Sequence, residues 1–305
     1  MKGKKFNLLT QIVLILVSLA LSTASASAQN APLSQIANAP VKTDSRMLYH
    51  GGPVRTFVQN VYFIFYGCWT GTCASADDTT AMNILGEFIA TIGNTPYMMI
   101  NSTYPDFTGP PASGAIVYAG MVVNSGYPHG LDLTQSDIEA IITDQIGNFG
   151  LPQDPQGIYI VVASADVASN ETGFCTPGAP PFHSSAVIYG LRLPYVFIGN
   201  PNRCATVAGW QFLPPSGGST PNGNFAADAM VGNLAHALNG LLTNPFGNAW
   251  YDRYGLENAD KCTGTFGQTY TTANGARANI RLGSRDFLLE QNWVNNRKGF
   301  CSLSR

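Results

Sequence analysis

Apolar residues along this chain fall into short continuous runs separated by polar and glycine-rich stretches. Runs at 57–66, 115–123 and 157–165 are rich in β-branched and aromatic residues, which is typical of buried strands. Two further runs, at 186–190 and 195–199, lie close enough in the sequence to form a hairpin. We therefore expect these segments to be the main strands.

Two helices are predicted between the early strands, each from its capping residues. Asp77 and Asp78 can cap a helix that ends near Ile92. Thr134 begins a second helix, and Asp137 three positions later completes the pattern of a capping box. Isoleucines at helical spacing follow and form one apolar face. Helices are thus predicted to separate the first three strands.

Two more helices are predicted in the C-terminal half. The first covers about 225–243 and ends at Asn244 and Pro245, because the residue before a proline avoids the helical conformation. A shorter helix is predicted for 284–294. Strands that alternate with helices favour a single α/β or α+β domain, with a mixed, mostly parallel sheet flanked by helices. We assign this domain to residues 47–305 and the preceding polar segment, 29–46, to a flexible leader.

The N-terminus has the three parts of a secretory signal peptide. Lys2, Lys4 and Lys5 precede an apolar run at 12–21, and small residues follow. The run is shorter than the roughly 20 residues that cross a bilayer, which disfavours a membrane anchor. Residues 1–28 are therefore predicted to be a signal peptide, and stable membrane insertion of the chain is not expected.

Charged residues make up only 11% of the chain, beside 32 glycines and 19 prolines. The net charge is −2, and it becomes more negative once the three lysines of the signal peptide are removed. With no basic block, nucleic acid is excluded as a partner. A weakly charged surface with many loops is common in extracellular proteins. Asn101 and Asn170 stand in glycosylation sequons, which apply only if the chain is made by a eukaryote.

Six cysteines in a secreted chain indicate disulfides. They allow fifteen connectivities, so the sequence alone leaves the pairing open. A C-x4-C spacing favours one local bridge, and the last cysteine, near the C-terminus, favours a bridge to the one before it. The favoured pairs are then Cys68–Cys73, Cys262–Cys301 and, as the remainder, Cys175–Cys204. Zinc binding by cysteine is disfavoured because no C-x2-C pair occurs.

The helix at 225–243 carries His236 on the side opposite to its apolar stripe, among small and polar residues. A zinc helix of the H-E-x-x-H type needs a second ligand one turn later and a carboxylate beside the first ligand. Gly240 and Ala237 occupy those two positions. A buried histidine with satisfied hydrogen bonds is the simpler interpretation. If a metal binds, its other ligands must come from His183, Asp252, Glu257 or Asp260.

The loop after this helix, 248–262, contains three carboxylates. Asp252, Glu257 and Asp260 offer the hard oxygen ligands that calcium prefers. Their spacing does not match an EF-hand, and an ordered loop held by Asx-turns and aromatic packing is the alternative. The helix and loop together are the candidate metal or ligand site.

Several short blocks follow one another in a fixed order, at 49–54, 164–167, 173–175, 196–201, 203–204, 243–247 and 260–262. Motifs such as Gly-Asn-Pro and Thr-Asn-Pro-Phe are weak individually, but the ordered set is specific. Through these blocks the chain resembles the EXORDIUM or phosphate-induced protein 1 family over about residues 49–301.

This resemblance implies a secreted protein of the cell wall or apoplast, linked in plants to growth control and without an established catalytic activity. Some microbial-type members carry His-Glu where this chain has His236 and Ala237, which suggests a degenerate zincin-like core. Relatives often have an additional cysteine after Cys175 and after Cys204. The absence of both here agrees with a direct bridge between these two residues.

Two functions compete. The first is a secreted, non-catalytic protein that binds a cell-wall glycan or an extracellular protein. The alternative is a zinc-dependent hydrolase of the peptidase class, with His236 as a remaining ligand. A serine hydrolase is disfavoured because the chain has no G-x-S-x-G motif. The residues at positions 237 and 240 favour the first function and no cofactor. Its candidate aromatic contacts are Trp69, Trp210, Trp250, Tyr251 and Tyr254.

Overall fold

The computed structural model describes residues 46–107, 109–176, 179–205 and 218–305. The predicted signal peptide, 1–28, and all of the predicted leader except Arg46 lie outside the described residues, as does Trp210.

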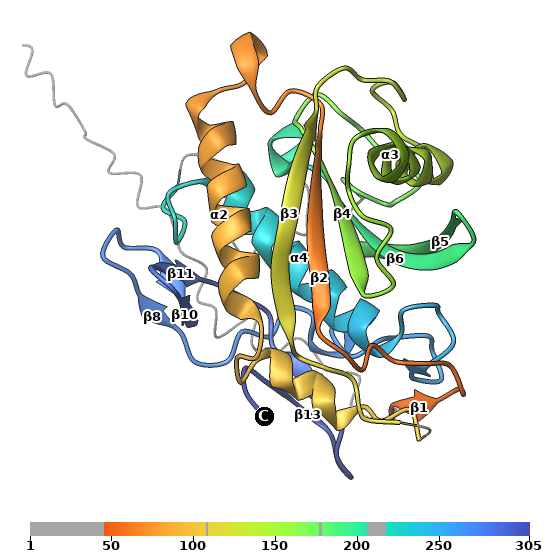
Figure 1. Cartoon of the computed structure of the whole chain (residues 1–305). Coiled ribbons are helices and arrows are strands. Elements are labelled where there is room, and N and C mark those ends of the chain that lie inside the picture. The colour runs from red at the N-terminus through yellow and green to blue at the C-terminus, as the bar shows by residue number, and fades with distance from the viewer. Residues whose placement is uncertain (1–45, 108, 177–178, 206–217) are drawn as a thin grey trace, which may run out of the picture. The chain divides into compact units, whose positions relative to one another are not determined.

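A five-stranded sheet organises the described chain, with the strand order β3-β2-β4-β6-β5 (Figure 1). Its strands are β2 (Gln59–Tyr66), β3 (Ile116–Asn124), β4 (Gly157–Ala163), β5 (Phe182–Ile188) and β6 (Leu191–Ile198). All neighbours run parallel except β5, which pairs antiparallel with β6 at the edge. The expected mixed, mostly parallel sheet is confirmed.

The sequence accounts for both the buried centre and the antiparallel edge. Every residue of β4 is buried, as expected for a parallel strand covered on both faces. The predicted hairpin is present as β5 and β6. Its two-residue turn is Tyr189–Gly190, with positive φ angles of 47° and 82° at both positions, which suits the right-handed twist of the strands.

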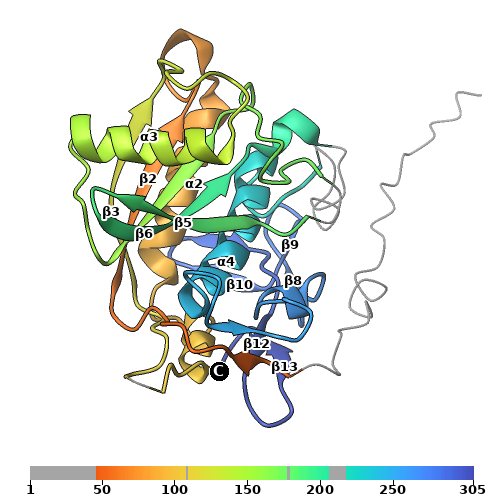
Figure 2. The same cartoon turned by 90° about the vertical axis from the view of Figure 1, so that its right-hand side faces the viewer.

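Three helices cover the two faces of the sheet. Helices α2 (Ala76–Ile92) and α4 (Phe225–Thr243) pack on one face, and α3 (Gln135–Asn148) packs on the other (Figures 1 and 2). Helix α4 has the predicted bounds and is buried along nearly its whole length. Among the described residues no helix combines the length and the apolar character that a bilayer span needs.

Both predicted helix starts are present, but one cap is a different residue. Thr134 and Asp137 form the expected capping box of α3. Helix α2 is capped by Ser75, whose hydroxyl accepts a hydrogen bond from the Asp78 backbone, while the Asp78 carboxylate accepts one from the Ser75 backbone. The expectation that Asp77 or Asp78 is the N-cap is therefore wrong, because Asp78 occupies the third position of the box.

The helix predicted at 284–294 is wrong. Strands β10 (Ile280–Leu282) and β11 (Arg285–Phe287) form an antiparallel hairpin there, and β12 (Asn292–Val294) follows. The turn of the hairpin contains Gly283, whose φ of +56° is the left-handed conformation that glycine favours. The two short strands are joined by Gly283 and Ser284, which is a sequence pattern of hairpins. Here this turn decides the conformation, although the leucines that follow have helical spacing.

The remaining described elements are short. They are β1 (Leu48–Tyr49), β7 (Trp250–Tyr251), β8 (Tyr270–Thr271), β9 (Arg277–Ala278), β13 (Phe300–Ser302) and the 3-10 helices η1 (Gly71–Cys73), η2 (Met98–Thr103), η3 (Pro201–Cys204) and η4 (Asp260–Cys262). Three disulfides involve η1, η3, η4 and β13. The pairs are Cys68–Cys73, Cys175–Cys204 and Cys262–Cys301, so the favoured connectivity is confirmed.

Candidate functional site

A cavity of about 590 Å³ lies beside the C-terminal end of α4. The elements that line it are the start of β5 with the segment before it, the residues that follow α4, and the loop leading to η4. Strand β5 and helix α4 face the viewer in Figure 2. The charged and titratable residues of the lining are Glu171, His183, Arg192, His236, Glu257 and Asp260.

His183, near the start of β5, forms one ion pair in this cavity. Its Nε2 lies 2.7 Å from Glu257 Oε2. The other carboxylate oxygen of Glu257 accepts a hydrogen bond of 2.6 Å from the Asn244 amide. Burial by itself would lower the pKa of His183, but the charge of Glu257 and the hydrogen bond to it outweigh burial and raise that pKa above its ordinary value.

His236 on α4 forms a second pair, held on both sides of the ring. Its Nε2 lies 3.0 Å from Asp260 Oδ1, and its Nδ1 lies 3.1 Å from Glu290 Oε2. Burial opposes the charged form, but hydrogen bonds to both carboxylates raise the pKa of His236 to about 10. At neutral pH the ring is therefore an imidazolium that donates both of its N–H groups.

Backbone groups fix the carboxylates in place. The Glu257 N–H donates to Asp260 Oδ2 at 2.8 Å, and the Gly264 N–H donates to Glu290 Oε1 at 2.7 Å. Burial raises the pKa of Asp260, but the hydrogen bond to His236 outweighs it and the pKa lies below its ordinary value. Asp260 is thus ionised at neutral pH, and backbone N–H groups orient Asp260 and Glu290 without any ligand.

Gly240 permits this arrangement. A Cβ at position 240 would lie 2.2 Å from Glu257 Oε2 and 2.8 Å from His183 Nε2, which is closer than real side chains approach. Ala237, at the position of the base in a zinc helix, is fully buried in the hydrophobic core and so does not face the cavity. Gly240 and Ala237, which replace the second ligand and the base of the H-E-x-x-H pattern, thus each have a structural reason: close packing on Glu257 and His183, and burial in the core.

The structure brings together four of the five predicted site residues. His183, His236, Glu257 and Asp260 all line the cavity, whereas Asp252 does not. Asp252 is fully buried, accepts hydrogen bonds from the backbone of its own loop, and lies 3.4 Å from the Lys261 ammonium. Its role is therefore to hold the loop, as the Asx-turn alternative expected.

Glu290 is a member of the site that the sequence reasoning did not identify. It lies between β11 and β12, in the segment predicted as a helix, so no pattern placed it next to His236. Glu290 follows two leucines and precedes Gln291, and this local sequence matches no motif for a binding or catalytic site. Within the part of the chain that the structure describes, no group of three or more His, Cys, Asp or Glu side chains is arranged to hold a metal ion.

Part of the lining of the cavity is apolar. Pro180, Pro181 and Phe182 form one side, and Pro245 and Phe246 form another. The guanidinium of Arg192 lies 4.6 Å from the centre of the Phe246 ring, a cation–π contact. Aromatic and proline walls with a few fixed polar groups are typical of ligand sites.

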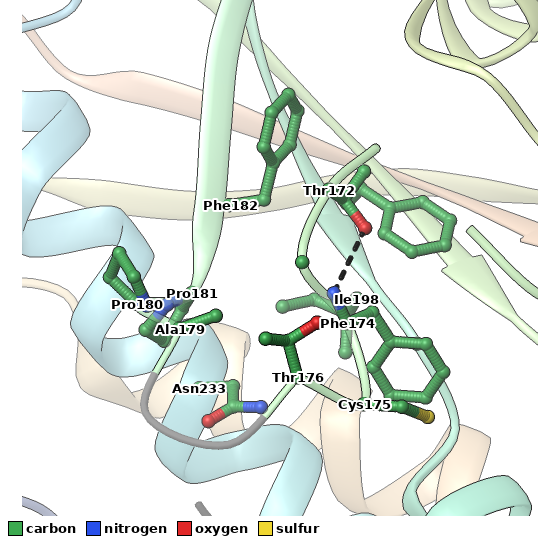
Figure 3. Close-up of a pocket in the computed structure, with 13 residues that line it drawn as sticks. Thr172, Phe174, Cys175, Thr176, Ala179, Pro180, Pro181, Phe182, Ile198 and Asn233 are labelled. Carbon is green, nitrogen blue, oxygen red and sulfur yellow. Dashed lines mark hydrogen bonds between the residues drawn. The ribbon is translucent and has the colours of Figure 1, made fainter. Parts of the chain in front are cut away.

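A second, much smaller hollow adjoins this cavity and shares part of its lining (Figure 3). It measures about 50 Å³ and is enclosed by the loop that contains Cys175, by Ile198 of β6 and by Asn233 of α4. Phe174 packs there against Gly199, where a Cβ would lie 2.4 Å from the ring. A space of this size holds water but no larger ligand.

The other predicted contact residues occupy various environments. Trp69 is fully buried, so its predicted ligand contact is wrong, and Trp250 is 6% exposed. Tyr254 is exposed, and its ring lies 4.7 Å from the guanidinium of Arg253. Tyr251 is half-buried. None of these aromatic residues lines the 590 Å³ cavity.

The two sequons differ in accessibility. Asn101 is fully buried, and its amide donates to Asn239 Oδ1 at 2.8 Å, so the folded chain cannot carry a glycan on that nitrogen. Asn170 is exposed, with only a long 3.4 Å hydrogen bond to Asp132. Asn170 is the accessible sequon of the two.

Comparison with known proteins finds a matching family and several similar plant proteins. The family model described as "Phosphate-induced protein 1 conserved region" matches residues 47–282. Protein EXORDIUM-like 5 of Arabidopsis thaliana is 29% identical over 83% of this chain and 76% of its own length. Protein EXORDIUM-like 3 of the same plant is 28% identical over 81% and 80%, and Protein PHOSPHATE-INDUCED 1 of Nicotiana tabacum is 34% identical over 49% and 50%. No solved structure matches the chain.

Proposed function

The chain belongs to the phosphate-induced protein 1, or EXORDIUM-like, family, and on that basis we propose that it is a secreted, non-catalytic binding protein of the cell wall or extracellular space. Its ligand site is the 590 Å³ cavity. The ligand class is a neutral, hydroxyl-rich molecule, namely an oligosaccharide. Three disulfides in the described chain support an oxidising, extracellular environment.

One observation carries this proposal, namely that two histidine–carboxylate pairs face a cavity of ligand size. Carboxylate oxygens can accept hydrogen bonds from sugar hydroxyls, and the histidine and amide N–H groups can donate to sugar oxygens. Each histidine of the site already has a carboxylate partner, so a neutral ligand fits better than an ion. Phe182 and Phe246 offer apolar faces for the C–H side of a sugar ring.

The same geometry supports binding without catalysis. Both ring nitrogens of His236 are engaged with carboxylates, so the ring has no free lone pair to act as a base. Position 237, which supplies the base in zinc peptidases of this helix type, is an alanine in the core.

Binding of neutral oligosaccharides to the purified protein tests the proposal. We expect a saturable heat of binding by titration calorimetry for at least one neutral wall oligosaccharide, and about tenfold weaker binding by Gly240→Ala, because the added methyl group displaces Glu257 and His183. Gly232→Ala on the same helix is the matched control, since a Cβ there meets nothing within 4 Å. Equal affinity of the two variants would reject the cavity as the site.

The second candidate is a zinc-dependent hydrolase with a degenerate zincin-like core. The observation in its favour is that His183 and His236, from different elements, line one cavity together with Asp260. It predicts about one equivalent of zinc in the purified protein and peptide cleavage that a chelator stops. A zinc content below about a tenth of an equivalent would sink this alternative.

A further inference from the structure

A separate cavity of about 430 Å³ lies around the turn between β12 and β13. It shares no lining residue with the 590 Å³ cavity. Its volume is within the roughly 300–1,000 Å³ of small-molecule sites. The residues that line it are Arg46, Met47, Trp250, Trp293, Asn295, Asn296, Arg297, Lys298 and Gly299.

The charge of this lining is entirely positive. Arg46 comes from just before β1, whereas Arg297 and Lys298 come from the β12–β13 turn, and all three side chains belong to exposed residues. No aspartate or glutamate is among the lining residues, and within the described chain none of the three cations forms an ion pair. Three like charges around one cavity repel one another, in a chain whose net charge is −2. The cavity therefore favours a negatively charged occupant.

The turn that carries two of these cations is fixed by hydrogen bonds. The Asn296 side-chain oxygen accepts from the backbone N–H of Lys298 at 3.1 Å and of Gly299 at 2.7 Å. The Asn295 backbone N–H donates to the Thr103 hydroxyl at 3.0 Å, which anchors the turn to η2. The backbone that carries Arg297 and Lys298 is thus ordered before a ligand binds.

Indole rings form the floor of the cavity. Trp293 packs so closely on Gly299 that a Cβ there would lie 2.1 Å from its ring, and Gly299 has a φ of +65°. The Lys261 ammonium lies 4.6 Å from the centre of the Trp293 ring. Trp250, the other indole, donates its N–H to the Pro105 carbonyl. Both aromatic side chains have fixed positions.

An exposed aromatic residue extends this floor beyond the cavity. Phe107 is 72% exposed and lies 6.2 Å from Trp250 and 5.2 Å from Tyr49, measured between ring centres. Its φ of +59° is uncommon for a bulky side chain, and such strain concentrates at binding sites. An exposed apolar ring therefore packs against Trp250, one of the residues that line the basic cavity.

We propose that this cavity binds the carboxylate groups of an acidic, uronic-acid oligosaccharide. Guanidinium groups pair with carboxylates through two parallel hydrogen bonds. The exposed ring of Phe107, which packs against Trp250 of the lining, offers a face to the sugar that carries the carboxylate. A nucleic acid is disfavoured because the protein as a whole is acidic. The site is independent of the neutral-ligand cavity.

Titration of the purified protein with an oligogalacturonide at low salt tests this proposal. We expect the binding to weaken with added salt, because salt screens exposed charge pairs. The methyl-esterified form of the same oligosaccharide keeps the sugar and loses the charge, so it should bind about tenfold more weakly. The double variant Arg297→Gln/Lys298→Gln should also bind about tenfold more weakly. Arg277→Gln, which removes an exposed charge on β9, is the control and should bind like the unsubstituted protein.

Three results would overturn the proposal. They are equal binding of the charged and esterified forms, unchanged affinity of the double variant, and full competition by inorganic phosphate at the concentration of the sugar. Gly240→Ala should bind the oligogalacturonide normally, so failure at this cavity is distinguishable from failure at the neutral-ligand cavity. Because both substituted side chains are exposed, an unchanged melting temperature should confirm that the double variant folds.

Discussion

At the scale of single residues, the glycines of α4 show most clearly how the sequence is shaped by the site. Both Gly232 and Gly240 cost the helix about 1 kcal/mol relative to alanine. A Cβ at position 232 meets nothing, whereas one at 240 collides with Glu257 and His183. The sequence alone does not tell the two glycines apart, because the groups that a Cβ at position 240 would meet come from distant segments.

The two glycines therefore predict opposite effects on stability. Gly240→Ala should lower the free energy of unfolding by about 1–3 kcal/mol, because overpacking outweighs the gain in helix propensity. Gly232→Ala should raise it by up to about 1 kcal/mol. Chemical denaturation of the two variants measures both values, and shifts of the same sign would contradict the geometry described for Gly240.

His236 predicts a dependence of stability on pH. Its pKa is raised from 6.5 to about 10 in the folded chain, so its contribution to stability is fully present below about pH 6.5 and is lost as the pH rises through 10. The stability difference between the unsubstituted protein and His236→Gln should therefore shrink by more than about 1 kcal/mol between pH 6 and pH 10. Denaturation of both proteins at the two pH values measures this, and a difference that stays constant or grows would refute the charged state of His236.

Among the histidines of the site and their carboxylate partners, four residues were predictable as residue types and Glu290 was not. His183, His236, Glu257 and Asp260 were predicted as candidates because their side chains suit ligand or metal binding. Which of them meet depends on how β5, α4 and the loop pack, and no motif encodes that packing. Glu290 shows the limit, since its role depends wholly on its distance of 3.1 Å from His236.

At the scale of elements, strands and helices with a strong hydrophobic period were predictable, while short hairpins were not. Helix α4 and strands β2 and β4 are long enough for their pattern to decide the conformation. The segment after residue 280 contains strands of three residues, too short to show a period. There the turn glycine, Gly283, decides the structure, and the wrong helix prediction followed from overlooking it.

Gly283 accordingly predicts a local effect on stability. Alanine at this position would take an unfavourable φ of +56°, and its Cβ would press at 3.1 Å on Glu87 and Thr91 of α2. Gly283→Ala should lower the free energy of unfolding by about 1–2 kcal/mol. Gly86→Ala within α2, where a Cβ meets nothing within 4 Å, should be neutral or stabilising. If Gly283→Ala is as stable as Gly86→Ala, the hairpin is not held by this turn.

At the scale of the whole domain, the class of fold followed from the alternation of elements, but the strand order did not. The first strand of the five-stranded sheet, β2, lies between β3 and β4, so the chain extends the sheet to one side and then to the other. This order is set by which faces α2 and α3 can cover at the same time, and a linear pattern does not contain it. The favoured disulfide pairing is present because each cysteine pairs with the neighbouring cysteine along the chain.

The disulfides differ in what they hold, and this predicts a ranking. Cys262–Cys301 spans 39 residues and ties η4, which begins at Asp260, to the last strand. Cys68–Cys73 spans only 5 residues, away from both cavities. Loop-closure entropy gives about 4 kcal/mol for the longer loop and about 2 kcal/mol for the shorter.

Replacement of each pair by serine tests this ranking. Cys262→Ser/Cys301→Ser should be the less stable variant in chemical denaturation and should also bind neutral oligosaccharide more weakly, because Asp260 loses its anchor and His236 its partner. Cys68→Ser/Cys73→Ser should lose less stability and keep its ligand affinity. Each double variant removes one disulfide, so the comparison separates a local role of Cys262–Cys301 in the cavity from the general effect of a cross-link. If Cys68→Ser/Cys73→Ser were instead the variant with the lower stability and the weaker ligand binding, η4 would be positioned by packing alone.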